Sequence, residues 1–150
     1  MRVPPIEIGA GYMLPLKIVN FNHMKELTKA EEQVMQILWD HGKAFVKNLI
    51  DDMPEPKPAY NTVSTIIRIL EKKGFVDHKA YGNTHEYFPL VSRKEYTRLY
   101  MKNFMHNYFS GSFKEMVSFF ARENKLSLSD LDELMKDVKN DLKEKNSSKK

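Results

Sequence analysis

Residues 58–76, PAYNTVSTIIRILEKKGFV, contain the pattern from which the rest of the fold can be worked out. At helical spacing, the aliphatic side chains of this stretch fall on one side, as in an ordinary core-facing helix. The other side carries short hydrogen-bonding groups around one arginine, although exposed helix surfaces usually carry Glu and Lys. We therefore expect a helix whose polar side contacts a partner. The aliphatic side holds Val63, Ile66, Ile67 and Leu70, and the polar side holds Asn61, Ser64, Thr65, Arg68 and Lys72.

The composition excludes several classes of site. The chain has 150 residues, of which 41% are hydrophobic and 29% charged, and it has no cysteine. Disulfides, thiolate metal sites and cysteine nucleophiles are therefore excluded, and a reducing, cytoplasmic location is expected. No apolar run approaches the roughly 20 residues that a membrane span needs. Glycine-rich phosphate loops, Ser-His-Asp signatures and metal-ligand sets are also missing, so we expect no enzyme, no cofactor and no metal.

Positive charge is concentrated around the two-sided helix. The net charge of +4 is weak support for an acidic partner by itself. From residue 57 to residue 82, however, five basic and two acidic side chains give a net charge of +3. From residue 26 to residue 55, three basic and seven acidic side chains give −4. The basic stretch therefore coincides with the helix that needs a partner.

Two further helices are expected before this one. The pair Thr28-x-x-Glu31 is a capping box, in which the hydroxyl and the carboxylate each accept a hydrogen bond from a backbone N–H group of the first turn. An apolar stripe follows it, and Gly42 ends the helix. A second short helix is predicted near residues 45–53.

After the two-sided helix the apolar period changes. Residues 75–80 and 85–90 are predicted to form two short strands, joined by the turn Tyr81-Gly82-Asn83-Thr84. Three helices followed by a hairpin constitute the winged helix-turn-helix arrangement, in which the third helix enters the DNA major groove and the hairpin is the wing. The fold class is therefore mainly α with a small β-hairpin, and a C-terminal α-helical dimerisation domain is expected to follow.

The chain after the hairpin is expected to form three helices, with a break at residues 109–112 and Ser129 as the cap of the last helix. This part is too small to be stable alone. It either folds back on the first domain or pairs with a second copy, and its apolar stripes favour pairing. The stripes are Tyr96, Leu99, Tyr100, Phe104 and Tyr108, then Phe113, Met116, Val117 and Phe120, then Leu131, Leu134, Met135 and Val138.

The polar side of the third helix has the chemistry of a DNA-reading surface. Arginine can bind guanine or phosphate, asparagine can read adenine, and hydroxyl groups can donate or accept. An alternative is that Asn61 only caps the helix, and that the hydroxyl groups are ordinary surface groups. Winged helices also serve as protein-interaction modules. The predicted DNA-contacting residues are Asn61, Thr62, Ser64, Thr65, Arg68 and Lys72 in the helix, and Lys79, Tyr81, Asn83 and Thr84 in the wing.

Three segments resemble the penicillinase-repressor (BlaI/MecI/CopY) family of bacterial regulators: LTKAEEQVMQILW, NTVSTIIRILEKKGFVDHK and THEYFPLVS. The resemblance runs from about Met24 to Lys143. It implies a homodimeric repressor that binds double-stranded operator DNA of dyad symmetry through its winged helix. In the antibiotic-resistance branch, a membrane sensor-protease signals the drug, and the repressor is then cut between an Asn and a Phe. Asn103-Phe104 stands in the matching place.

The resemblance also sets the expected domain limits and shows two departures. We expect an extension at residues 1–23, a winged helix at 24–91, a dimerisation domain at 92–145 and a tail at 146–150. The extension has no counterpart in the family and is expected to be disordered or an over-long reading frame. Ala59 replaces the serine that often caps the third helix.

The copper-responsive branch of the family is excluded, because this chain has no cysteine. A protein-interaction adaptor and a small-ligand-responsive regulator are the alternative functions.

Overall fold

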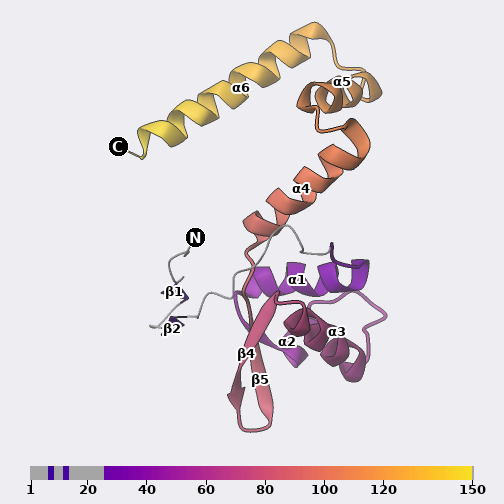
Figure 1. Ribbon diagram of the computed structural model, residues 1–150, viewed down its shortest axis with the longest axis vertical. Helices are drawn as coiled ribbons and strands as arrows, with labels where there is room; N and C mark the ends of the chain where they lie inside the picture. Colours follow the sequence, from indigo (N-terminus) through magenta and orange to yellow (C-terminus); the bar gives the residue numbers. More distant parts are fainter. Residues whose placement is uncertain (1–6, 9–11, 14–25, 150) are drawn as a thin grey trace. The chain divides into compact units, whose positions relative to one another are not determined.

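The computed structural model describes residues 7–8, 12–13 and 26–149, and these divide into one unit up to Tyr100 and another from Met101 (Figure 1). Most of the expected extension lies outside the described residues. Within it, β1 (Glu7–Ile8) and β2 (Tyr12–Met13) pair antiparallel. The other elements are α1 (Lys29–His41), β3 (Ala44–Phe45), α2 (Val46–Asp51), α3 (Tyr60–Lys72), β4 (Val76–Tyr81), β5 (Thr84–Pro89), α4 (Arg93–Phe109), α5 (Phe113–Glu123) and α6 (Leu128–Ser147).

Helix α1 begins and ends where the sequence predicts. Thr28 is the N-cap, and its hydroxyl accepts a hydrogen bond from the N–H of Glu31 at 3.2 Å. The Glu31 carboxylate accepts from the N–H of Thr28 at 3.1 Å, which completes the capping box. At the other end, Gly42 has φ +76° and its N–H donates to the carbonyl of Leu38 at 2.8 Å. Both ends of the helix are thus fixed by local chemistry.

The first unit has one hydrophobic core, to which α1, α2, α3 and the hairpin all contribute. Figure 1 shows the three helices grouped together, with the β4–β5 hairpin extending from them. Met35, Leu38, Leu49, Ile67 and Leu70 are completely buried. The Trp39 indole N–H donates to the carbonyl of Val91 at 2.8 Å and so ties α1 to the chain that follows the hairpin. The core side of α3 is therefore closed by the protein itself.

The sheet has a third strand that the sequence does not reveal. Ala44 and Phe45 form β3, which pairs antiparallel with β5 opposite Tyr87 and Glu86. As a result α2 begins at Val46 and ends at Asp51, so it is shorter than the predicted helix over residues 45–53. A two-residue strand is too short to show an alternating pattern, because strand prediction needs runs of four or more residues.

The two strands of the wing hairpin have the predicted length, but they lie one residue closer to the tip and their loop is tighter than predicted. Strands β4 and β5 pair from Val76 opposite Pro89 to Tyr81 opposite Thr84. Only Gly82 and Asn83 form the loop, and Gly82 has the positive φ (+61°) that a two-residue hairpin loop needs. At the base of the hairpin, the carbonyl of Phe75 accepts from the N–H of Leu90 at 2.8 Å. The wing is therefore anchored directly behind the end of α3.

The beginning of α4 belongs to the first unit, and this corrects one predicted dimerisation residue. Tyr96 is buried, and its hydroxyl accepts a hydrogen bond from the N–H of Leu27 at 3.0 Å. Its ring packs against Trp39 and Phe75, with ring centroids 5.9 and 5.8 Å apart. Tyr96 thus completes the core of the winged helix and has no surface left for a second copy. The prediction failed because one helix continues across the boundary between the units.

The second unit has no buried residue in its described part, which runs from residue 101 to residue 149. Ser112 caps α5 as its hydroxyl accepts from the N–H of Glu115 at 3.2 Å. Ser127, and not the predicted Ser129, caps α6, because it forms a capping box with Asp130. The large apolar side chains of these helices are left exposed; among them are Phe113, Phe119, Phe120, Leu128, Leu134, Met135, Val138 and Leu142.

A partly buried ion pair joins the start of α1 to the end of α3. Both carboxylate oxygens of Glu31 accept from Nζ of Lys73, at 2.9 and 2.8 Å, and Glu31 is only 6% exposed. Burial acts to raise the pKa of Glu31, but the hydrogen bonds from Lys73 and Thr28 outweigh it and the pKa lies below its usual 4.5. The charged carboxylate therefore stabilises the folded state above pH 4.5, and this contribution is lost as the pH falls through the lowered pKa.

Replacing Glu31 by glutamine is therefore expected to reduce the free energy of unfolding by about 1–3 kcal/mol at pH 7. The difference from the wild-type protein should shrink below pH 4.5, as the pH falls toward the lowered pKa of the wild-type carboxylate. Urea unfolding at pH 7 and at pH 3.5 measures both values. Glu32→Gln is the matched control, since Glu32 lies one residue along the same turn without the Lys73 contact, and a change within about 0.5 kcal/mol is expected.

Candidate nucleic-acid interface

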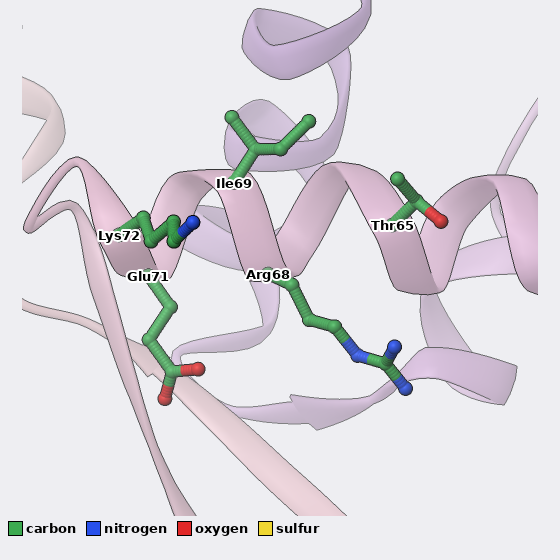
Figure 2. Close-up of a pocket in the computed structure, with 5 residues that line it drawn as sticks. All are labelled: Thr65, Arg68, Ile69, Glu71 and Lys72. Carbon is green, nitrogen blue, oxygen red and sulfur yellow. The ribbon is translucent and has the colours of Figure 1, made fainter.

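The outward side of α3 presents polar and cationic side chains. Asn61, Thr62, Thr65, Arg68 and Lys72 are all exposed. Residues 61, 65, 68 and 72 follow the spacing of one helical face, opposite the buried Val63, Ile67 and Leu70. A shallow open depression along this side is lined by Thr65, Arg68, Ile69, Glu71 and Lys72 (Figure 2).

The N-terminus of α3 lacks a side-chain cap. Ala59 is the N-cap, and no side-chain hydrogen bond satisfies the first turn. The alternative that Asn61 serves only as the cap is therefore not realised. The backbone carbonyl of Asn61 accepts a hydrogen bond from the hydroxyl of Thr65 at 2.8 Å, and the Asn61 side chain is exposed. An uncapped helix N-terminus also leaves backbone N–H groups that favour an anion such as phosphate.

Ser64 lies in a different place from the one predicted. Its exposed fraction is only 8%, so it cannot reach a base edge. It belongs to the buried residues of α3, together with Val63 and Ile67. The helical pattern missed this because a small polar residue at the edge of a face fits either side.

The charge of Arg68 acts on Tyr87 of the wing strand β5. Burial raises the pKa of Tyr87, and the negative charge of Glu71 adds to this effect. The positive charge of Arg68 acts in the opposite direction. Figure 2 shows Arg68 and Glu71 extending to the same side of α3. The guanidinium group thus lies on the side of α3 that carries Glu71, and the residue is exposed.

The wing presents its predicted residues near its tip. Lys79, Tyr81, Asn83 and Thr84 are exposed. Nζ of Lys79 lies 5.2 Å from the centre of the Tyr81 ring, a distance at which a cation and an aromatic face attract. The Tyr81 ring also lies 6.0 Å from that of Phe45. The Thr84 hydroxyl donates to the carbonyl of Tyr81 at 2.9 Å, so its proton is used within the hairpin.

The base of the wing contains a cluster of side chains of the type that binds metals. Ligand atoms of Glu71, Asp77 and His78 all lie within 4.8 Å of one another, and each residue is partly exposed. Nδ1 of His78 already pairs with Glu71, and the His78 ring stacks on that of His85 with centroids 4.0 Å apart. These contacts link the end of α3 to β4. We therefore interpret the cluster as a structural link between α3 and the wing.

Comparison with known proteins identifies the family of this chain. The family model described as "Penicillinase repressor" matches residues 27–140. This chain belongs to the penicillinase repressor family. That family consists of DNA-binding transcriptional repressors and not of enzymes, so the chain is a DNA-binding repressor and the predictions of family and of a non-enzymatic role are confirmed.

Individual relatives of this penicillinase-repressor family member are moderately similar. The methicillin resistance regulatory protein MecI of Staphylococcus aureus (strain N315) is 32% identical over 114 residues, or 75% of this chain and 93% of the relative. The penicillinase repressor of Bacillus licheniformis is 25% identical over 110 residues, or 73% and 86%. The solution structure of the DNA binding domain of the repressor BlaI gives a TM-score of 0.43 at 23% identity, covering 48% of this chain and 89% of that one.

One exposed residue of α3 was missed by the reading of the sequence. Ile69 is 39% exposed and lies beside Thr65 on the outward side. The signal was available, because Ile66, Ile67, Ile69 and Leu70 span too wide an arc to fit one core face.

The predicted cleavage pair, Asn103 and Phe104, lies inside α4, and both residues are half-buried. The Phe104 ring packs against the Tyr108 ring, with their centroids 5.2 Å apart.

Proposed function

We propose that this family member acts as a homodimer on an operator of dyad symmetry, with the α3 of each chain in one major groove and the wing on the adjacent backbone. The observation that carries the proposal is the outward side of α3, where Asn61, Thr65, Arg68 and Lys72 face solvent beside the wing while the opposite side is closed by the core. Asn, Thr and Arg side chains recognise base edges, and Lys neutralises phosphate.

The second unit supports the dimer. Phe113 and Phe120 of α5 are 67% and 64% exposed, and Leu134 and Val138 of α6 are 54% and 44% exposed. A single chain rarely leaves so many large apolar groups in water, and contiguous apolar patches mark protein–protein contacts. Covering them with the same surface of a second copy would bury them without any other partner. The remaining predicted stripe residues, from Leu99 to Met135, are proposed to belong to the same contact.

Proteolytic release completes the proposal. Asn103 and Phe104 lie after the boundary between the two units, on the C-terminal part of α4. Cutting the bond between them would separate the DNA-binding head from α5 and α6. A protease binds an extended chain, so this helix must open locally before it is cut. The proposed agent is a membrane sensor-protease of the antibiotic-resistance type.

In this chain itself, no helix in the described ranges is long and apolar enough to cross a membrane.

A fluorescence-anisotropy titration tests the proposed operator binding. Fragments of the DNA next to the gene are titrated with the full chain at two salt concentrations, and one fragment is expected to bind more tightly than a random duplex of equal length. Its affinity should fall steeply with salt, because bound phosphates release counterions. Equal, weak binding to every duplex would reject a sequence-specific repressor and favour the protein-interaction alternative.

Arg68→Ala is expected to weaken operator binding by about 1–3 kcal/mol and to relax preference at one or two base pairs. The reason is that Arg68 is the one arginine of α3, and it lies exposed on the outward side. Competition binding against single-substituted operators measures both effects. Lys79→Ala is the control for a phosphate contact: it should weaken binding to all sequences alike and lower the salt slope by about one. A variant Arg68→Ala with unchanged sequence preference would contradict the placement.

A further inference from the structure

The outward side of α3 has an apolar row beside its polar one. Thr62, Thr65 and Ile69 are three and four residues apart, so their side chains lie one above the other along one flank. All three are exposed, and Ile69 is 39% exposed. In Figure 2 the Ile69 side chain extends to the side of α3 opposite Arg68 and Glu71. The cationic and the apolar groups thus occupy separate flanks of the same surface.

The hydrogen bonding of Thr65 makes its methyl group the free part of the side chain. The Thr65 hydroxyl donates to the carbonyl of Asn61, one turn earlier, at 2.8 Å. With its proton used inside the helix, the hydroxyl offers no donor to a ligand. Figure 2 shows the hydroxyl directed along α3 and the methyl carbon on the side where Ile69 lies. Thr65 and Ile69 therefore form a small patch of methyl groups on the recognition surface.

The core does not explain this patch. Ile67 and Leu70 are completely buried and Ile66 packs against the same core, whereas Ile69 remains outside it. A single exposed isoleucine is ordinary. Here, however, it stands next to the Thr65 methyl and within one turn of Arg68 and Lys72, which suit an anionic partner. The partner that fits both flanks is polyanionic and carries small apolar groups.

We infer that Thr65 and Ile69, extended by Thr62, read the C5-methyl groups of thymines in the major groove of each operator half-site. In the major groove only thymine presents a methyl group, and it discriminates an A·T pair from a G·C pair by apolar contact. The inference rests on the proposed operator binding and adds a specificity determinant to it. It assigns Arg68 and Lys72 to guanine or phosphate and the Thr65–Ile69 flank to thymine.

The test uses deoxyuridine, which differs from thymidine only by lacking this methyl group. A preferred duplex is first selected from a random pool with the full chain, and each thymine of the half-site is then replaced in turn. Wild-type binding should weaken roughly fourfold at each contacted thymine, the ratio for burying one methyl-sized apolar group. No change at any thymine would overturn the inference, whereas failure to select any duplex would also reject the proposed function.

Two variants connect the effect to the named residues. Ile69→Ala and Thr65→Ser should each weaken binding to the thymine duplex. Binding by each variant should also become insensitive to deoxyuridine at one position, because the lost side-chain methyl group and the thymine methyl group form one contact, and removing either of them removes that contact. Thr65→Ser keeps the hydroxyl and its bond to Asn61. Lys72→Ala is the matched comparison: it should weaken binding to both duplexes by the same factor. Undiminished sensitivity to deoxyuridine in both Ile69→Ala and Thr65→Ser would overturn the assignment.

Discussion

A chain that ends at Asn103 is expected to fold normally and yet to bind the full operator about 10²–10⁴-fold more weakly than the complete chain. All the buried residues that the structure describes lie between Leu27 and Tyr96, so this truncation removes no part of the core. It removes α5 and α6, whose exposed apolar residues are proposed to hold the dimer. Binding of the second head then stops being an intramolecular step, and the gain from linking two heads is lost.

The readout that isolates this effect is the comparison of full and half operators. The truncated and complete chains should bind a single half-site with similar affinity, because α3 and the wing are the same in both. Only the full operator should separate them, and sedimentation equilibrium should show the complete chain as a dimer and the truncated chain as a monomer. A truncated chain that keeps full operator affinity would mean that the winged helix itself dimerises, and the proposed role of α5 and α6 would be rejected.

A full-length variant removes the concern that truncation acts in some other way. Leu134 and Val138 are exposed on α6 and lie four residues apart, so they share one face. Changing both to glutamate places charges in the proposed contact, and burying unpaired charges there would be costly. The variant should be monomeric and should match the truncated chain on both operators. The winged helix does not contain either residue, so its thermal unfolding should stay unchanged.

The elements that the sequence predicts well are those governed by contacts between near neighbours in the chain. The capping box of Thr28 and Glu31, the stop at Gly42 and the two sides of α3 all depend on residues within a few positions. A hydroxyl three residues before a carboxylate, or apolar side chains every three or four residues, is sufficient to specify them. The order of three helices and a hairpin then follows, and with it the winged helix and its outward α3.

The features that sequence reasoning missed depend on contacts between distant residues. Strand β3 exists because Ala44 and Phe45 pair with β5, some forty positions later. Tyr96 has the spacing of the stripe to which it was assigned, but the N–H of Leu27 and the rings of Trp39 and Phe75 draw it into the first unit. Periodicity shows that a residue is apolar on a helix face; it does not show which neighbour covers that face.

The candidate site shows the same division. Four of the six predicted α3 contacts, Asn61, Thr65, Arg68 and Lys72, share one exposed face, and the period of the helix is enough to find them. The prediction for Ser64 failed because tertiary packing, and not the helical period, decides its burial. The free methyl group of Thr65 depends on the single hydrogen bond from its hydroxyl to the carbonyl of Asn61. Such bonds have no signature in the sequence.

Phe75→Ala is expected to have the largest effect on stability, a loss of about 3–5 kcal/mol in the free energy of unfolding. Phe75 leads the completely buried side chains in volume, and it is 1% exposed. Its ring contacts Tyr96 edge-to-face at 5.8 Å, so it packs the end of α3 against the start of α4. Its backbone anchors the wing, because its carbonyl accepts from Leu90 and its N–H donates to the carbonyl of Leu70 at 2.9 Å.

The backbone bonds survive in Phe75→Ala, so the substitution measures the side chain alone. The transfer free energy of the ring and the cavity left beside Tyr96 both contribute to the loss. Phe75→Leu fills most of that space and should cost less than half as much, as volume-conserving apolar exchanges usually do. Urea unfolding followed by Trp39 fluorescence gives both values, since the Trp39 ring packs against the same Tyr96. Equal losses for alanine and leucine would show that the ring geometry, and not the filled volume, holds the wing to the helices.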